Sequence, residues 1–469
     1  MSERKILILG GGLTGLATAY YLATRAREAG AGLSLTVLEA SDRWGGKIVS
    51  ERAGGFLIEG GPDSFITRKP WALELIRELG LDDQVIETPP ASGKVFLLRG
   101  GRPVELPEGM VFVVPTLEEP FLDSEVMSEE GKRRVLAEVD VPPRSETGDE
   151  SLADFLRRRF GPEALDRLGQ PLMAGIHAAD PERLSLAAAF PEMATMETRF
   201  GSLIRGLRQV HRGSGLAATK NSSRVSLRGG IGQLADTLAA RLAPGTLQLG
   251  RAAASLERGP EGFLVRDRRG GWWPADAVVI ALPAFAASEL VAELAPELAK
   301  RLGEIRYVST ATVSLGFRRQ DVTHPLEGLG VVFPTAEGRD LQACTWSSSK
   351  FAGRAPESDV LIRAFVGGAG AEHLLDQDDE ALVSLALDEL TPLLGLGAPP
   401  HLMRVYRWPQ GIPQFEIGHR ARVESIAAAG ADGLFLAGNA YQGLGLPDAV
   451  RSAREAADAA LGFACRAQV

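Results

Sequence analysis

The stretch "KILILGGGLTGLATAYYL", residues 5–22, decides the fold of this chain. A short apolar run rich in strand-forming residues leads straight into Gly10, Gly12 and Gly15, and apolar residues then recur at helical spacing from Leu13 onward. The glycine pattern alone proves little, because a chain with 54 glycines in 469 residues produces G-x-G-x-x-G by chance about 0.7 times. The elements predicted around these glycines therefore have to show whether the motif binds a nucleotide.

A second strand and an acidic residue supply that context. The run "LSLTVLEA" (residues 33–40) predicts a strand with Glu39 at its end. In a strand–turn–helix–strand unit of this kind, Gly10 makes the turn, Gly12 lets the backbone approach a pyrophosphate, and Gly15 lets helix and strand pack closely. The helix N-terminus attracts the phosphates, and Glu39 takes the ribose hydroxyls. We therefore expect a dinucleotide site; a purely structural glycine turn is the alternative.

The composition of the chain excludes several classes of protein. A formal net charge of −9 argues against a nucleic-acid partner, whose phosphates demand a basic face. The two cysteines, Cys344 and Cys465, lie far apart, which excludes a disulfide framework or a zinc cluster and favours a reducing cytoplasm. A strand that begins by Lys5 leaves no room for a signal peptide, and no apolar run is long enough to span a membrane. Peripheral contact with the inner face of the cell membrane stays open.

A second glycine-rich segment indicates which dinucleotide is bound. The sequence "SDRWGGKIVSERAGGFLIEGGPDSF" (residues 41–65) places a twin glycine (residues 45–46) after Arg43, and a further glycine pair (residues 60–61) before Pro62. The twin glycine lets the backbone come close to a second phosphate or ribose. Nicotinamide dehydrogenases do not usually need such a segment, and R-x-G-G after the acidic residue resembles the FAD-binding amine-oxidase-like superfamily. We therefore expect FAD, bound without a covalent link.

Flavoproteins of that superfamily interleave their domains, and the pattern along this chain is interleaved too. We predict an α/β fold of mixed α+β character, in which a Rossmann-like FAD-binding domain is interleaved with a mixed-sheet substrate domain and a helical lobe. The expected FAD-binding domain comprises residues 1–90, 225–300 and 425–469. Residues 91–224 are expected to form the helical lobe, for which membrane contact stays open, and residues 301–424 the substrate-binding domain.

Motifs spread over nearly the whole chain carry a more specific resemblance. The sequence is similar to the protoporphyrinogen and coproporphyrinogen oxidases of haem biosynthesis, which show in the same order GGGLTGLATAYYL, GGPDSF, PLMAGIHAADPERLSLAAAFP, ACTWSSSKFAGRAP, RWPQGIPQFEIGH and GNAYQGLGLPDA. Amine oxidases and carotenoid desaturases do not share the middle motifs. Within the family, three features favour the Gram-positive type, which oxidises coproporphyrinogen III. They are the ACTW run, Asp63, where most protoporphyrinogen-specific members have asparagine, and Lys69, where plant and animal enzymes have arginine.

The resemblance implies a six-electron oxidation of coproporphyrinogen III to coproporphyrin III, with FAD as hydride acceptor, O₂ as oxidant and H₂O₂ as by-product. Protoporphyrinogen IX is the alternative substrate. An FAD amine oxidase or desaturase, and a non-catalytic protein of the GDP-dissociation-inhibitor type, are less favoured. The six histidines show no metal spacing, so we expect no metal. Haem-pathway enzymes are candidate partners besides the porphyrinogen and O₂, and monomer and homodimer both stay open.

The same resemblance assigns candidate residues for substrate and catalysis. Asp63 is the leading polar group beside the flavin, where a carboxylate would orient a pyrrole NH and stabilise developing positive charge; a plain turn residue is the alternative. Lys69 would pair with a substrate propionate, or be an ordinary solvated lysine. Val332, Thr345 and Phe365 align with residues that line the macrocycle cavity, or belong to the strand core.

A substrate with four propionates should meet more basic groups at the mouth of its site than one with two. The sequence offers Arg68, Lys69, Lys350 and Arg354 for that role.

The expected cofactor contacts cover both glycine-rich segments and three later regions. Backbone near Ala253 would meet the adenine, Trp408 would lie near the flavin ring or be a core aromatic, and the start of the last helix would point at the pyrophosphate or the flavin edge. The full set is Gly10, Gly11, Gly12, Leu13, Thr14, Gly15, Glu39, Ala40, Arg43, Gly45, Gly46, Lys47, Gly61, Pro62, Asp63, Ser64, Ala253, Trp408, Gly438, Gly445, Leu446, Pro447 and Asp448.

Overall fold

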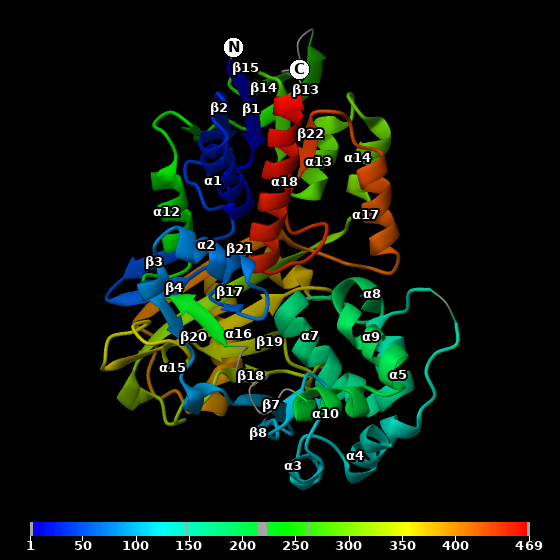
Figure 1. Ribbon diagram of the computed structural model, residues 1–469. Coiled ribbons are helices and arrows are strands. Elements are labelled where there is room, and N and C mark those ends of the chain that lie inside the picture. Colours follow the sequence, from blue (N-terminus) through cyan, green and yellow to red (C-terminus); the bar gives the residue numbers. More distant parts are fainter. Residues whose placement is uncertain (1–2, 147, 214–222, 260–261, 467–469) are drawn as a thin grey trace.

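The computed structural model describes residues 3–146, 148–213, 223–259 and 262–466. Five parallel strands from widely separated parts of the chain form the sheet that carries the opening motif (Figure 1). In the order in which they pair, they are β12 (Leu247–Gln248), β2 (Leu33–Leu38), β1 (Arg4–Leu9), β16 (Ala277–Ile280) and β22 (Leu434–Leu436). The apolar run that predicted a fully buried strand is β1, whose residues Ile6 to Leu9 are at most 2% exposed.

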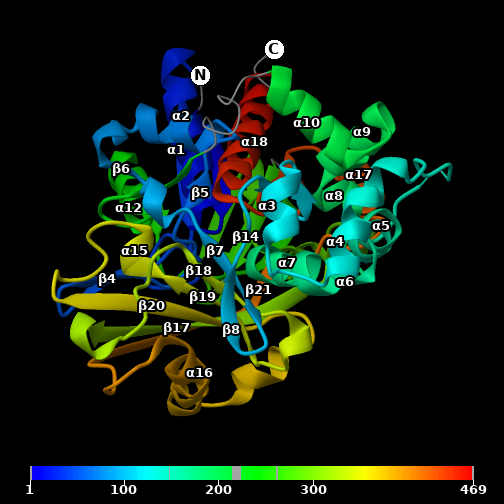
Figure 2. The ribbon, with the colours of Figure 1, turned by 90° about the horizontal axis from the view of Figure 1, so that it is seen from below.

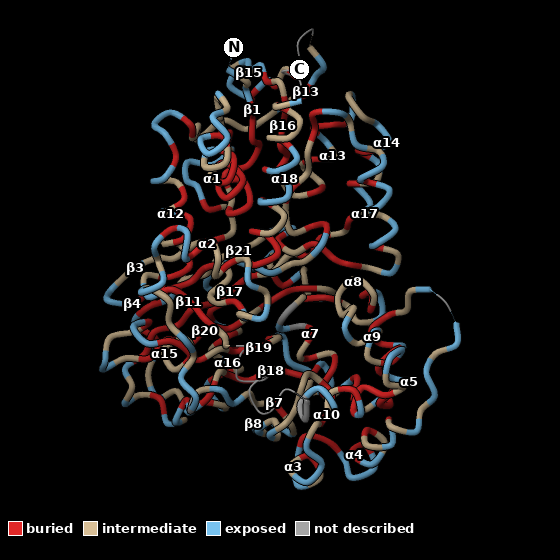
Figure 3. Tube along the Cα trace, in the orientation of Figure 1, coloured by how far each residue is buried: buried red, intermediate tan, exposed pale blue. Residues whose placement is uncertain are grey.

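Two hydrophobic cores flank this parallel sheet, because successive side chains of a strand point to opposite faces. Ile6 and Ile8 enter one core, and Leu7 and Leu9 enter the other. The first core lies under α1 (Leu13–Glu28), α2 (Trp71–Glu78), α12 (Gly232–Arg241) and α18 (Leu446–Arg466). The second lies under α13 (Ala284–Val291), α14 (Pro296–Gly303), α17 (His419–Ala428) and the antiparallel strands β13 (Ala253–Gly259), β14 (Gly262–Asp267) and β15 (Trp272–Ala275). Both cores stand out as buried in Figure 3.

A seven-stranded mixed sheet forms the second layer of the molecule. Its order is β21 (Leu402–Pro413), β17 (Tyr307–Arg318), β20 (Asp359–Gly367), β19 (Leu341–Trp346), β18 (Gly330–Val332), β7 (Val95–Arg99) and β8 (Arg102–Glu105). Only the β18–β7 pair is parallel. The helix α16 (Asp379–Leu394) packs against one face, turned away from the parallel sheet (Figure 2). The opposite face is therefore available to the other parts of the molecule.

In the part of the chain that the structure describes, eight helices form a lobe beside this sheet (Figure 2). They are α3 (Glu118–Asp123), α4 (Glu129–Leu136), α5 (Leu152–Phe160), α6 (Pro162–Ala164), α7 (Gln170–His177), α8 (Leu186–Ala189), α9 (Pro191–Phe200) and α10 (Leu203–Gly213). Gly161, with a φ of +93°, and Pro162 separate α5 from α6. Among the described residues, no helix is long and apolar enough to cross a membrane.

Short strands connect the two sheets and the lobe. They form the hairpin β3 (Ser50–Ala53) with β4 (Phe56–Glu59), the pair β9 (Met110–Val111) with β10 (Val114–Pro115), and the three-stranded sheet β5 (Phe65–Ile66), β11 (Arg224–Leu227) and β6 (Val85–Glu87). The strands β7 and β8 lie inside the range expected for the helical lobe but pair into the seven-stranded sheet. The three-domain division itself stays a prediction.

A buried ion pair joins three helical segments of the lobe. The Arg159 guanidinium on α5 and the Glu138 carboxylate form a pair in which both side chains are fully buried. Glu138 also accepts hydrogen bonds from the backbone N–H groups of Leu203 (3.0 Å) and Ile204 (3.2 Å) at the start of α10. One carboxylate therefore holds α5 and caps α10.

We predict that Glu138→Ala destabilises the protein by about 3–5 kcal/mol, because a buried charge is left short of its partner. Thermal unfolding of the purified protein measures the effect as a lower Tm. The control is Glu182→Ala, which breaks the ion pair of Arg157 on the same helix, where both side chains are roughly half exposed; it should shift Tm little. Equal shifts in the two variants would contradict a special role for the buried pair.

Candidate functional site

The glycine turn lies between the carboxyl ends of β1 and β16, where the strand order of the parallel sheet changes direction. Gly10 has a φ of +106°, and a Cβ on it would lie 2.8 Å from the Ala281 carbonyl oxygen. A Cβ on Gly15 would lie only 1.8 Å from the Gly10 carbonyl oxygen. The turn and close-packing roles predicted for these two glycines are confirmed, at the place where open parallel sheets bind ligands.

The N-terminus of α1 is left open to an anion. Its N-cap residue, Gly12, supplies no side-chain cap, and the first turn holds no acidic residue. The twin glycine segment lies directly against it, with the Gly45 N–H donating to the Gly11 carbonyl at 2.8 Å. Uncapped backbone N–H groups and the positive end of the helix dipole suit a pyrophosphate. These residues fit the phosphate part of FAD.

Glu39 stands at the end of β2 beside this turn. Its Oε2 accepts from the Gly11 N–H at 2.6 Å, and its Oε1 accepts from the backbone N–H and the hydroxyl of Ser41, both at 2.8 Å. The Glu39 carbonyl also accepts from the Arg251 N–H at 2.7 Å, which brings the segment that leads to Ala253 alongside. The carboxylate is thus oriented at the turn, and its place suits ribose hydroxyls.

Arg43 and Lys47, two residues predicted to contact the cofactor, donate hydrogen bonds to backbone carbonyl groups of the protein. The Arg43 guanidinium donates to the carbonyl oxygens of its own loop, at Trp44, Gly46 and Ile48. Lys47 Nζ donates to the Gly411 carbonyl, and burial lowers the pKa of this amine to about 8. Both residues shape the twin-glycine loop, and a direct contact with FAD stays a prediction.

The start of α18 already has its own negative group. Asp448 lies in the first turn of this helix, 5% exposed, and both of its carboxylate oxygens lie 2.7 Å from Lys69 Nζ. The Asp448 carboxylate is thus neutralised by Lys69 at this helix end, and a contact of the start of α18 with the pyrophosphate or the flavin edge stays a prediction. Nearby, the Gly438 N–H donates to Ser452 Oγ at 2.9 Å.

The segment that carries Gly60 and Gly61 lies flat against the free face of the seven-stranded sheet. Its Gly60 carbonyl accepts from Trp408 Nε1 at 2.8 Å and from Arg363 Nη2 at 3.2 Å. The same Arg363 nitrogen donates to the Gly61 carbonyl at 2.6 Å. Trp408 is thereby fixed at the junction between the two sheets.

The three predicted cavity residues share that same face. Val332 and Phe365 both pair with Ala343 in the strand register, and Thr345 pairs with Arg363. Directly paired residues point to one side of a sheet, as do residues two apart, so Val332, Thr345, Phe365 and Arg363 lie on one face. Gly175 of α7 faces Val332 at the edge of this surface. The structure thus brings the half-buried Val332, Thr345 and Phe365 together with the buried Arg363, beside the Gly60–Gly61 segment.

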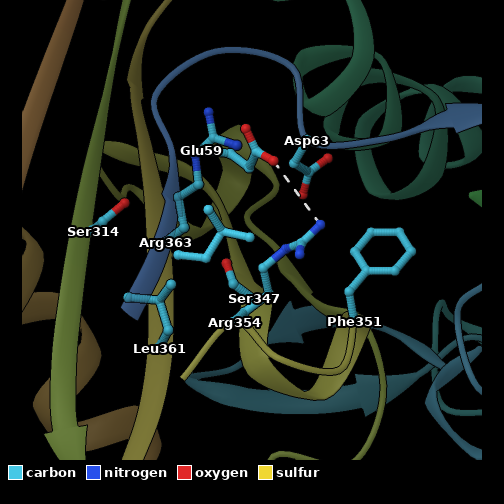
Figure 4. Close-up of a pocket in the computed structure, with 9 residues that line it drawn as sticks. Glu59, Asp63, Ser314, Ser347, Phe351, Arg354, Leu361 and Arg363 are labelled. Atoms are coloured by element: carbon cyan, nitrogen blue, oxygen red, sulfur yellow. Dashed lines mark ion pairs between the residues drawn. The ribbon is translucent and has the colours of Figure 1, made fainter. Parts of the chain in front are cut away.

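Asp63 belongs to a buried network of charges (Figure 4). Its two carboxylate oxygens lie 2.8 and 2.6 Å from Lys350 Nζ. Burial alone raises the pKa of the Asp63 carboxyl, but the Lys350 ammonium and the Arg363 guanidinium outweigh it and hold that pKa well below its usual range. Asp63 is therefore ionised, and Lys350 occupies both of its oxygens.

The sequence offered Lys350 and Arg354 as basic groups at the mouth of the substrate site, and this expectation is wrong because both lie inside the protein. Both side chains are buried, and Arg354 donates to Ser226 Oγ at 2.8 Å and to the Leu227 carbonyl at 3.0 Å. Arg354 also pairs with Glu59 at 3.9 Å, as the dashed line in Figure 4 marks. The sequence motif held both cations, but nothing in it indicated that they point inward.

A cavity of about 10 Å³ lies within this network, with room for one water-sized molecule at most. This cavity is therefore too small for a dinucleotide or a macrocycle. The residues that line the cavity are Leu57, Glu59, Asp63, Ser314, Ser347, Phe351, Arg354, Leu361 and Arg363.

Comparisons with known proteins agree with this architecture. The family model of flavin containing amine oxidoreductases matches residues 13–461. The chain is 32% identical over 467 residues to the coproporphyrinogen III oxidase of Bacillus subtilis (98% of each chain) and 32% identical over 480 residues to the chloroplastic protoporphyrinogen oxidase of Oryza sativa (96% of this chain, 87% of the relative). It superimposes with a TM-score of 0.85 on a provisionally assigned protoporphyrinogen oxidase from Exiguobacterium sp. 255-15, at 32% identity over 98% of each chain.

We predict that Gly15→Ala abolishes retention of flavin, because the new methyl group would overlap the Gly10 carbonyl and push α1 away from the turn. The flavin absorbance per protein after gel filtration measures it. The matched control is Gly462→Ala in α18, where a Cβ meets no atom within 4 Å. Full flavin content in Gly15→Ala would contradict the assignment of this turn.

We predict that Asp63→Asn lowers Tm at pH 7 by several degrees, because Lys350 loses its charge partner in a buried place. A carboxylate with a depressed pKa contributes stability above its unfolded pKa of about 3.9 and loses it as the pH falls through the folded value. The gap in Tm between wild type and variant should therefore stay constant from pH 7 to about 4 and narrow only below that.

The control for this pair is Asp458→Asn, which removes the partner of Arg25 at a carboxylate that is 58% exposed. It should show little loss at any of these pH values. A gap for Asp63→Asn that closes already between pH 7 and 5 would contradict the depressed pKa.

Proposed function

The chain belongs to the flavin-containing amine oxidoreductase family, in its branch of protoporphyrinogen and coproporphyrinogen oxidases, and on that premise we propose that it oxidises coproporphyrinogen III to coproporphyrin III. It is an FAD-dependent oxidase. The reaction removes six electrons and six hydrogens from the macrocycle, and three O₂ molecules take them up as three H₂O₂. The product is an aromatic porphyrin.

One observation supports this proposal above the others. The Gly60–Gly61 segment, which follows the nucleotide-binding turn in the chain, lies against the free sheet face that carries Thr345 and Phe365. A flat cofactor held at the turn and a flat macrocycle held on the sheet face would therefore meet at this segment. Proximity and orientation account for most of what such an oxidation needs.

FAD, when bound, supplies the acceptor for a hydride from a bridge carbon of the porphyrinogen. Residues of the chain position the macrocycle and shield it from water. Val332 and Phe365 give the macrocycle an apolar surface from which water is excluded. Asp63, held by Lys350, fixes the loop of residues 60–64 through Ser226, whose hydroxyl donates to the Asp63 carbonyl at 2.7 Å. We assign Asp63 this positioning role rather than that of a free base.

Protoporphyrinogen IX remains the second candidate substrate, since the chain is 32% identical to both enzymes, although the alignment covers 98% of the one from Bacillus subtilis and 87% of the one from Oryza sativa. Coproporphyrinogen III carries two further propionates, so the two substrates differ mainly in negative charge. From the sequence we also propose a location in the cytoplasm and haem-pathway enzymes as partners.

We predict that the FAD-loaded protein oxidises coproporphyrinogen III several-fold faster than protoporphyrinogen IX when both are supplied aerobically. Porphyrin fluorescence follows product formation, and H₂O₂ release at three per porphyrin checks the balance. Equal or reversed rates would assign the protein to protoporphyrinogen IX instead. Oxidation of neither compound would refute the proposed function.

A further inference from the structure

The charges around Asp63 do not balance. The cations that act on this carboxylate are Lys350, Arg363, Arg354 and Arg224, whereas the carboxylate that acts on it is Glu59. Cations therefore outnumber carboxylates in a region that is largely buried. Such an excess is costly unless other groups solvate each cation or an anion joins the cluster.

Three of these cations have protein acceptors. Lys350 holds both oxygens of Asp63, and Arg363 donates to the Gly60 and Gly61 carbonyls. Arg354 donates to Ser226 Oγ and to the Leu227 carbonyl, and lies 3.9 Å from Glu59. These three cations are therefore committed to the fold.

Arg224 is different. Within the described parts of the chain, its guanidinium makes no hydrogen bond and no ion pair. Its side chain is half-buried, so the lack of a partner is not simply the state of a freely solvated surface arginine. Burial lowers the pKa of this guanidinium while Asp63 raises it, and an arginine side chain stays charged in either case.

The strand β11 determines which way Arg224 points. Residues two apart on a strand share a face, so Arg224 lies on the side of Ser226, whose hydroxyl bonds to the Asp63 carbonyl. The cross-strand neighbour of Arg224 is Ile66, which is 49% exposed, whereas Ser226 is fully buried. Arg224 therefore stands between the buried network and solvent, on the face that looks toward Asp63.

Lys69, the residue that the sequence favoured for a propionate, is in a different situation. Its ammonium already holds both oxygens of Asp448, so a substrate carboxylate would have to displace a buried partner. Arg224 has no such competitor, and its planar guanidinium matches a carboxylate through two parallel hydrogen bonds.

We propose that Arg224 binds a propionate carboxylate of the porphyrinogen and so determines which carboxylated macrocycles the site accepts. This inference rests on the proposed function, because that function supplies a substrate with carboxylates. A propionate is a side chain on the edge of the macrocycle and takes no part in hydride loss from a bridge carbon, so this contact contributes to binding in the ground state and the transition state alike.

The test uses the FAD-loaded protein and the variants Arg224→Gln and Arg224→Lys. For Arg224→Gln we expect KM for coproporphyrinogen III and Kd for the product coproporphyrin III to rise by about tenfold, as loss of a charge-assisted hydrogen bond predicts. The value of kcat should stay within about twofold. Arg224→Lys keeps the charge and should recover part of the affinity, and the difference in Kd between wild type and Arg224→Gln should shrink at high salt.

Arg454→Gln is the matched control, because Arg454 is a partly exposed arginine that pairs with Glu74 and does not belong to the Asp63 network. The KM and Kd of this variant should equal those of the wild type. An unchanged KM and Kd in Arg224→Gln would overturn the proposal, and so would a loss of flavin or a fall in kcat at constant KM. Failure of the proposed function has a different signature: wild-type protein that oxidises neither porphyrinogen, whatever Arg224 does to the Kd of coproporphyrin III.

Discussion

The lack of side chains at Gly60 and Gly61 is the constraint on which the arrangement of this molecule depends. A Cβ on Gly61 would lie 1.8 Å from the Lys47 carbonyl oxygen, and a Cβ on Gly60 would lie 2.7 Å from the Tyr406 ring. Only bare backbone fits between the twin-glycine loop and the sheet face. The carbonyl groups that this backbone exposes are then held by Arg363 and Trp408. Two layers that are distant in the chain are thereby fixed at a separation set by one dipeptide.

The part of the site that is local in sequence was predictable. A strand, a glycine turn and a helix follow one another in residues 5–22, and their roles depend on neighbours within the same unit. Gly15 meets Gly10, and Glu39 meets Gly11, at the positions that the motif requires. Three strands of the parallel sheet, β1, β16 and β22, contain short continuous apolar runs, which such a sheet favours, whereas Ser34 and Thr36 interrupt β2 and β12 ends in Gln248.

The charge network could not be read from the sequence, because it depends on tertiary contacts. Asp63 and Lys350 are 287 positions apart, and Lys69 and Asp448 are 379 apart. A lysine or an arginine in a motif looks the same whether it faces solvent, a carboxylate or a ligand. Only the strand register decides that Arg363 points at Gly60 and that Arg224 lies on the side of Ser226. The sequence therefore supplied the residues of the site but not their partners.

The interleaved sheets have a consequence for the order in which the protein can be assembled. The central strand β1 leaves the ribosome long before β22, which completes its sheet, and α18, which covers it, at residues 434–466. Long-range pairings of this kind are slow to form. The nascent chain thus carries a strand of bare apolar residues and an incomplete nucleotide turn through nearly all of its synthesis. The parallel sheet and its core cannot be completed before residues 434–466 have been synthesised, and an unpaired apolar strand is prone to aggregation until then.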